Sequence, residues 1–161
     1  MKLDMNGDIV ITGTFRDLVD FDPGPGVDTL NGGANTSTYI SKFNAQGDFL
    51  WARHFRATSS CYAYGLTFDQ NNNIILSGTF TQTTDFDPSG NSLDLTSGIY
   101  GAIFLAKLSE QGNLIWVDQI QGDAGIQSYE VISDQQNNYY LSGQLWGPGT
   151  VDVDPGPGIF N

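Results

Sequence analysis

The sequence predicts an all-β protein that is built from a repeated unit of 65 residues. Residues 4–15 (DMNGDIVITGTF) return as 69–80 (DQNNNIILSGTF) and again as 134–145 (DQQNNYYLSGQL). No stretch keeps the roughly 3.6-residue apolar period of an amphipathic helix, and Gly, Asn and Pro interrupt the chain at short intervals. Since each copy carries the same pattern, the unit is what must be explained in structure and function.

Alternating apolar residues locate the strands within one unit. Ile74, Leu76 and Phe80 fall on one face of an extended segment, and the matching positions of the other copies alternate in the same way. In the middle copy the expected strands are residues 64–68, 74–80, 102–108 and 114–120. The connection between the first two of these strands and the connection between the last two are short. Both contain Asn or Gly where a hairpin needs a positive φ, so each joins two antiparallel neighbours.

Four antiparallel strands in a unit that repeats at fixed spacing are typical of a β-propeller blade. A β-sandwich is the competing all-β architecture, but a sandwich does not need the same residues at every 65th position. The sequence therefore predicts a partial β-propeller of about two and a half four-stranded antiparallel blades. Residues 1–60 are expected to form a partial blade, 61–125 a complete blade and 126–161 a second partial blade.

A chain of this kind is expected to continue into further blades of the same parent protein. Its first and last residues both fall inside a copy of the repeat. Terminal repeats without caps leave strand edges unpaired, and such edges favour aggregation. We therefore expect the isolated 161 residues to be marginally stable.

Charge and composition exclude several classes of partner. The chain has 18 acidic and 6 basic residues and a formal net charge of -12, and such a surface repels nucleic-acid phosphates and anionic lipid headgroups. We expect neither as a partner, and the apolar stretches are far shorter than the roughly 20 residues of a membrane span. Cys61 is the one cysteine, which leaves no disulfide framework and no thiolate metal site.

Long connections carry a recurring pair of Asp residues. Residues 16–36 and 81–98 each contain DFDP, and a related DVDP follows in the third copy. Because residues two apart in an extended chain point the same way and carboxylates suit Ca²⁺, these pairs are candidate calcium ligands. The candidates are Asp20 and Asp22, Asp85 and Asp87, and Asp152 and Asp154. Asp before Pro is also ordinary turn chemistry, in which the carboxylate accepts backbone N–H groups, so both interpretations stay open.

No arrangement of catalytic residues recurs in the sequence. His54 is the one histidine, and it aligns with Gln119, so the repeat does not require an imidazole. A G-x-S-x-G nucleophile motif is absent. We therefore expect the segment not to be an enzyme, with no catalytic residue and with calcium as its one cofactor. The alternative is a fragment of a propeller enzyme, a quinoprotein-like dehydrogenase or a hydrolase, whose active residues lie outside this chain.

Three motifs together resemble a known repeat family. The run D-x-x-N-N-x-x-x-S-G-T-F, the D-F-D-P loop and the run I-F-x-A-K-L-x-x-x-G-N-L-x-W are similar to the SBBP-type β-propeller repeats of large secreted bacterial proteins. The resemblance covers essentially the whole chain. It implies an extracellular or cell-surface location and a non-catalytic role as a scaffold or binding platform for a protein or a glycan. It also implies that the first strands, 64–68 and 129–133, lie nearest the channel of the propeller.

Overall fold

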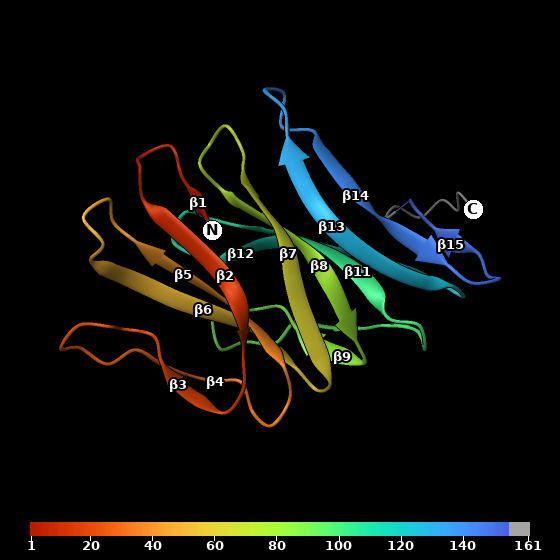
Figure 1. The fold of residues 1–161 in the computed structure, drawn as a ribbon, viewed down its shortest axis with the longest axis horizontal. Coiled ribbons are helices and arrows are strands. Elements are labelled where there is room, and N and C mark those ends of the chain that lie inside the picture. Colours follow the sequence, from red (N-terminus) through yellow and green to blue (C-terminus); the bar gives the residue numbers. More distant parts are fainter. Residues whose placement is uncertain (155–161) are drawn as a thin grey trace.

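The computed structural model describes residues 1–154, which contain fifteen β-strands and no helix (Figure 1). Along the long axis the N-terminal unit (red to orange) is followed by the middle unit (yellow to green) and then by the C-terminal unit (blue). In this part of the chain there is consequently no helix of the length and apolarity that crossing a membrane would take. The prediction of an all-β fold is confirmed.

The first sheet combines the N-terminal unit with a hairpin from the middle unit. Its six strands follow the order β1-β2-β5-β6-β9-β10, and all neighbours pair antiparallel. The bounds are β1 Lys2–Leu3, β2 Ile9–Phe15, β5 Ser37–Phe43, β6 Phe49–Ala57, β9 Thr83–Asp85 and β10 Asp94–Thr96. A separate hairpin, β3 (Leu18–Asp20) with β4 (Thr29–Asn31), forms a small sheet of its own.

The second sheet contains the four predicted strands of the middle unit and one strand of the last unit. Its order is β15-β12-β11-β8-β7, again antiparallel. The bounds are β7 Ser60–Phe68, β8 Ile74–Thr81, β11 Ala102–Leu108, β12 Leu114–Gly122 and β15 Val151–Asp152. The last unit adds the antiparallel pair β13 (Gly125–Ser133) and β14 (Tyr139–Trp146).

The four predicted strands of the middle unit are present, with β8 one residue and β12 two residues longer at the end than predicted, and the largest difference is at the start of β7. This strand begins at Ser60, whereas the sequence predicted a start at residue 64. A β-bulge at Tyr64 explains the difference, because the register with β8 shifts between Ala63 and Gly65. One extra residue reverses the inside-outside alternation, so Cys61 and Leu66 are both buried although they are an odd number of positions apart.

Both long connections that follow the second strand of a unit contain a hairpin that the sequence did not predict. β9 extends the first sheet by pairing with the end of β6, where Asp85 lies opposite Arg56 and Thr84 opposite Ala57. β15 pairs in the same way with the end of β12. We call β6 and β12 the outer strands. We call the pairing of β9 with β6, and of β15 with β12, a clasp.

A cluster of aromatic rings forms the core beneath the first clasp. Phe86 lies between the two strands of the hairpin connection and is fully buried. Its ring centroid is 5.0 Å from Phe55 of the preceding outer strand, and 5.2 Å and 5.1 Å from Phe80 and Phe104 of its own unit. The Asp-Phe-Asp sequence therefore inserts its aromatic residue between two units, while Asp85 and Asp87 on either side stay only partly buried.

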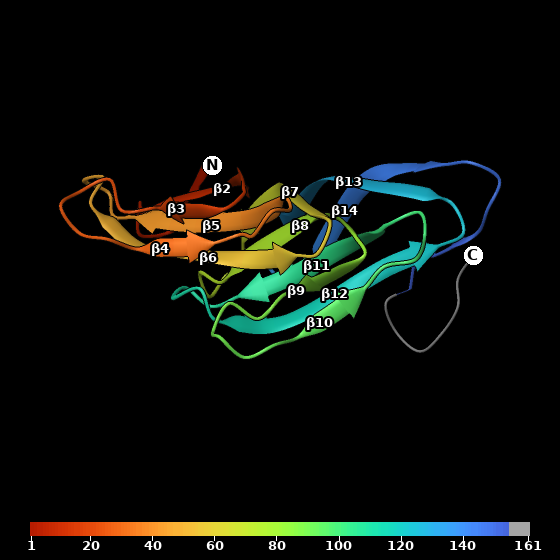
Figure 2. The ribbon, with the colours of Figure 1, turned by 90° about the horizontal axis from the view of Figure 1, so that it is seen from below.

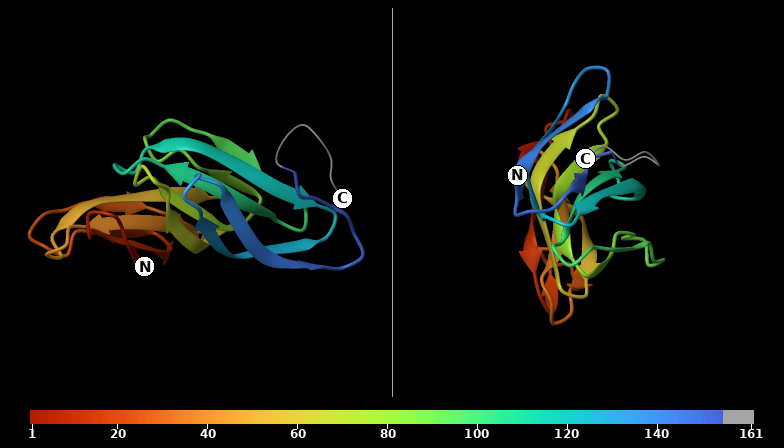
Figure 3. Two further views of the ribbon diagram at one scale, coloured as in Figure 1. Left: turned by 90° about the horizontal axis from the view of Figure 1, so that it is seen from above. Right: turned by 90° about the vertical axis from the view of Figure 1, so that its right-hand side faces the viewer.

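The side views show how the units are stacked. Seen from below, the sheet of the N-terminal unit lies at one end, and β10 is drawn below β12 (Figure 2). In the end-on view the first strands of the three units (red, yellow and blue) lie on one side of the molecule, and the green connection lies on the other (Figure 3, right). The clasps are thus on the opposite side from the first strands.

Replacing Phe86 with Ala should lower the free energy of unfolding by about 4 kcal/mol, because a fully buried ring is lost and a cavity is left. The matched change Phe21→Ala removes the equivalent ring of the N-terminal unit. Since Phe21 is only partly buried, we expect a loss of about 2 kcal/mol. Urea unfolding of both variants measures the difference, and equal losses would mean that the position between two units adds nothing to the contribution of Phe86.

Candidate functional site

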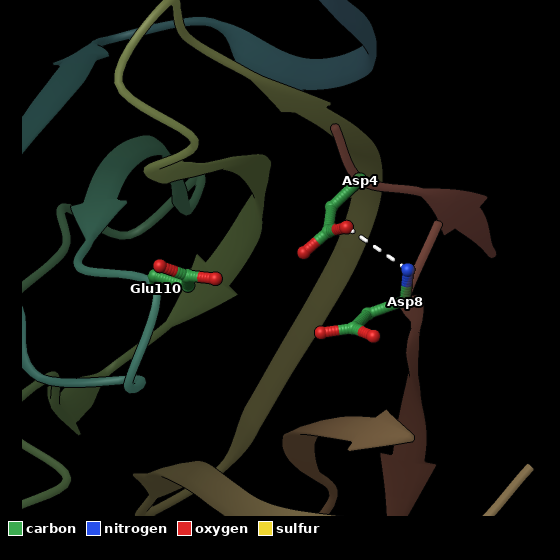
Figure 4. A group of neighbouring side chains, drawn as sticks. All are labelled: Asp4, Asp8 and Glu110. Carbon is green, nitrogen blue, oxygen red and sulfur yellow. Dashed lines mark hydrogen bonds between the residues drawn. The ribbon is translucent and has the colours of Figure 1, made fainter. Parts of the chain in front are cut away.

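A buried cluster of charges lies where the N-terminal unit meets the middle unit. Lys42 of β5 is 3 % exposed, and its Nζ lies 2.8 Å from Asp4 Oδ2 and 3.1 Å from Asp8 Oδ2. Glu110 reaches the same ammonium from the turn between β11 and β12, at 3.3 Å. Figure 4 shows the three acids converging from two units. A carboxylate of the middle unit therefore joins the ion-pair network of the N-terminal unit.

These three acids form the one group of described residues whose geometry could hold a metal ion. One ligand oxygen from each of Asp4, Asp8 and Glu110 lies within 4.8 Å of the others. The Lys42 ammonium, however, contacts all three carboxylates. A side chain of this protein thus supplies the positive charge that a metal would bring, and the cluster is an ion-pair network.

Asp4 is held in place by the turn that precedes β2. Its Oδ1 accepts the backbone N–H groups of Asn6 at 2.8 Å and Asp8 at 3.0 Å (Figure 4). Asp69 and Asp134 cap the equivalent turns of the other units through the same pair of positions. The Asp that opens each repeat is thus a turn cap. The second oxygen binds an ammonium in Asp4 and Asp69, whereas in Asp134 it accepts hydrogen bonds from Asn138 and Tyr140.

The same cation recurs in the middle unit. Lys107 Nζ lies 2.7 Å from Asp69 Oδ2 and donates a hydrogen bond of 3.2 Å to Tyr139 Oη of the next unit. Burial by itself would raise the pKa of Asp69, but hydrogen bonds from Lys107 and Asn73 hold that pKa below its usual value. For Asp4, burial likewise acts to raise the pKa, and Lys42 and the turn N–H groups bring it below normal. Both carboxylates are therefore ionised at neutral pH.

An Asn in the left-handed conformation links the turns of the middle and last units to the unit before them. Asn72 has φ of 61°, its Oδ1 accepts the Met5 N–H at 3.0 Å, and its Nδ2 donates to Asp4 Oδ2 at 3.1 Å. Asn137 repeats the first contact by accepting the Gln70 N–H at 2.9 Å. From the sequence alone this Asn is expected only to form a hairpin turn. Its recurrence at positions 72 and 137, together with the recurring Lys, was the available signal for a polar lock between units.

The Asp pairs proposed as calcium ligands form turns. The first Asp of each pair accepts the N–H of the second, at 3.1 Å for Asp20, 3.0 Å for Asp85 and 3.1 Å for Asp152. Asp20 and Asp85 also accept the N–H eight positions later, at 2.9 Å and 3.0 Å. Asp22 and Asp87 each accept the N–H two positions later. This geometry is that of the structural turn, in which backbone donors already use one oxygen of each carboxylate.

The structure distributes these pairs over different connections. Each pair is internally joined by its turn, but in residues 1–154 no pair gathers a third acid that could complete a metal group. Asp154, the last candidate, is also the last residue described and has hydrogen-bonding or electrostatic partners of its own. Calcium binding at the pairs stays a prediction, with the turn as its structural basis.

One of the pairs borders a polar hollow at the first clasp. The hollow has a volume of about 320 Å³, and Asp85 and Asp87 line it together with His54 and Arg56 of β6. Burial, followed by the charge of Arg56, lowers the pKa of His54. The imidazole is therefore neutral at pH 7, and the adjacent guanidinium disfavours a metal cation at this place.

Two tyrosines occupy the same repeat position on the first strands. Tyr64 of β7 and Tyr129 of β13 are each the extra residue of a β-bulge. They are 45 % and 49 % exposed, although large side chains on an inner strand are usually covered. Both line a hollow of about 390 Å³ to which Met1 and Glu130 also contribute. We call Tyr64 and Tyr129 the tyrosine ledge.

Replacing Lys42 with Met should lower the free energy of unfolding by about 3 kcal/mol at pH 7, because Asp4 would be left buried without its counter-charge. In the wild type, the depressed pKa of Asp4 contributes stability above the unfolded value of 3.8, which is lost as the pH falls through the folded pKa. The variant lacks the part of this contribution that comes from Lys42, while the turn N–H groups remain, so the two proteins should converge below about pH 4. Urea unfolding across pH measures this, and exposed Lys2→Met is the control. A pH-independent difference would assign the loss to packing.

The double variant Asp20→Asn with Asp85→Asn separates the two interpretations of the Asp pairs. Asn keeps an oxygen that accepts the backbone N–H groups, so in chelator the variant should melt within about 1 °C of the wild type. If the pairs also bind Ca²⁺, calcium at ten times its Kd should add about 1.4 kcal/mol per site to the wild type alone. Thermal melting with calcium and with chelator measures both effects. An equal melting temperature in calcium for both proteins would leave the turn as the complete explanation.

Comparison with known proteins supports the repeat architecture. No protein-family model matches the chain. The chain is 27% identical over 152 residues to an uncharacterized WD repeat-containing protein, L264, of Acanthamoeba polyphaga mimivirus. The match covers 89% of this chain and 11% of the viral protein, so the chain spans about a tenth of the length of that relative. Together with the antiparallel four-stranded middle unit, this likeness shows an all-β chain that is part of a β-propeller.

Proposed function

We propose that this partial β-propeller is a non-catalytic scaffold that binds a protein partner on the tyrosine ledge. The observation that carries the proposal is that Tyr64 and Tyr129 are exposed at the same bulge position in two successive units. A bulge redirects the side chain of its extra residue, and such positions are common beside functional sites. Tyrosine supplies a large apolar face and a polar end, which suits it to protein interfaces.

The contacts of the two rings support a preformed surface. The Tyr64 ring stacks on Tyr62 with a centroid distance of 6.2 Å and an interplanar angle of 14°. The Tyr129 hydroxyl hydrogen-bonds to Gln144 Oε1 of β14. Because both rings are fixed by neighbours, a partner would lose little side-chain entropy in ordering them. The adjacent Glu130 gives the ledge an acidic side that favours a basic segment.

The placement of the reactive groups supports a non-catalytic role. Burial raises the pKa of the Cys61 thiol to about 12, which leaves almost no thiolate at neutral pH. His54 is neutral and lies beside an arginine. The two buried ammonium groups, Lys42 and Lys107, are bound to turn carboxylates. Each of these groups has a structural use in the described part of the chain.

We also propose a cellular location for this scaffold. An SBBP-type repeat of a secreted or cell-surface bacterial protein accords with the three sequence motifs and with a net charge of -12. Calcium at extracellular, roughly millimolar concentration would relieve repulsion among the Asp pairs if they bind it weakly. The acidic surface supports partners other than nucleic acid.

A displayed library of random 12-residue peptides and a glycan array test the ledge. We expect peptides selected on the wild type to lose at least about tenfold in affinity for the double variant Tyr64→Ser with Tyr129→Ser, a loss of about 1.4 kcal/mol. The control is Tyr100→Ser, which removes an exposed tyrosine far along the chain from the ledge. Binding that survives in the double variant would contradict the site. Binding to glycans alone, lost in the same variant, would replace the protein partner with a carbohydrate.

A further inference from the structure

The two clasps in this protein share their strand register and one backbone hydrogen bond. In the first, Asp85 pairs with Arg56, and the Thr58 N–H donates to the Thr83 carbonyl at 2.8 Å. In the second, Asp152 pairs with Gln121, and the Asp123 N–H donates to the Thr150 carbonyl, also at 2.8 Å. The clasp is thus a defined interaction between one unit and the unit before it.

The N-terminal unit carries the same hairpin, but within residues 1–154 no strand pairs with its outer edge. β3 pairs with β4, and the two form a sheet of their own in the described chain. The N–H groups of Asp17 and Phe21 donate toward β4, to the carbonyls of Gly33 and Asp28. Because donors alternate along a strand, the N–H groups of Leu18 and Asp20 face the other way. Leu18, whose position matches that of Thr83, is 69 % exposed.

In the described chain, the aromatic cluster under this hairpin lacks the ring that a preceding unit would supply. Phe21 lies 5.2 Å from Phe15 and 4.8 Å from Tyr39, as Phe86 lies against Phe80 and Phe104 in the middle unit. Phe86 is also contacted by a ring of the preceding outer strand, Phe55. Among the described residues no outer strand supplies that ring to Phe21, which is consequently only partly buried.

We propose that the free edge of β3 is a docking site for the outer strand of another unit of this repeat. That strand would pair antiparallel with Val19 and Asp20, and its next N–H would donate to the Leu18 carbonyl. The residue before the two paired ones would be large and apolar and would cover Phe21, as Phe55 covers Phe86. Strand addition of this kind derives its affinity from backbone hydrogen bonds and its specificity from the side-chain pocket.

The repeat itself identifies the occupant. The ends of the two outer strands of this chain, β6 and β12, are already covered by β9 and β15. A second copy would therefore offer no free outer strand of the required kind. A further unit, in contrast, continues an interface that occurs twice in the molecule.

The new junction would depend on the clasp more than the other two do. At the positions of Asn72 and Glu110, which bind the preceding unit, the N-terminal unit has Gly7 and Ala45. Neither residue has a polar side chain, so the lock of amide and carboxylate contacts is missing there. The ladder on β3 and the apolar contact with Phe21 must then supply the binding energy.

Hydrogen exchange of the whole chain with a synthetic peptide tests the proposal. The probe is residues 47–58 (GDFLWARHFRAT), which contain the outer strand β6. At saturation we expect exchange of the Leu18 and Asp20 amides to slow by at least about tenfold. A peptide with Phe55→Asp should give no protection. The amides of Thr83 and Asp85, already in a clasp, report that the chain stays folded.

Two variants of the chain make the test specific. Leu18→Pro removes the outward N–H and should abolish protection of Asp20, whereas Leu18→Ala keeps the N–H and should preserve it. The Tyr64 and Tyr129 double variant should keep the protection, so failure of the ledge is distinguishable from failure of this site. Absence of peptide-dependent protection at Asp20 would overturn the proposal. A dimer in sedimentation that protects β3 without peptide would also overturn it, in favour of a second copy.

Discussion

The insertion of one residue between consecutive units is the contact on which the rest of this structure depends. Phe86 is fully buried because Phe55 of the preceding unit closes the cluster that Phe80 and Phe104 begin. A single unit of four strands could not bury both faces of its sheet by itself, so its stability comes from contact with its neighbours. The clasp fixes the position of the Phe86 ring along β6, since β9 pairs with β6 in one register. Packing between units and pairing between strands thus reinforce the same arrangement.

The charges of the molecule follow from this requirement. A net charge of -12 would oppose close approach of the units if the carboxylates were unpaired. Asp4 and Asp69 are instead used to cap turns and to bind the ammonium groups of Lys42 and Lys107. Glu110 adds a contribution from the next unit. These buried ion pairs specify which turn lies against which, although their net contribution to stability is limited by the cost of removing the charges from water.

The division between the two sides of the molecule bears on function. The two clasps and the Asp pairs lie on one side, where β9 and β15 pair with the preceding outer strands and the edge of β3 has no strand partner among the described residues. The first strands lie on the other side, and there the tyrosine ledge is left exposed. A scaffold can vary such an exposed position without affecting the interactions that hold its units together. This separation is the reason for locating a partner on Tyr64 and Tyr129 and a further unit on β3.

The sequence by itself determined the unit, its strands and its hairpin turns, because period-two alternation and residues with positive φ are local properties of the chain. The Asp pairs were also found from sequence, as were both of their interpretations. The tertiary structure decided that β9 and β15 join the outer strands of the preceding unit, and that Phe86 lies between two units. It also decided that Lys42 meets Glu110, 68 residues away in sequence. These contacts join residues of different units. The repeat pattern could not predict them, because the pattern is the same in every unit and does not specify which neighbouring unit a side chain contacts.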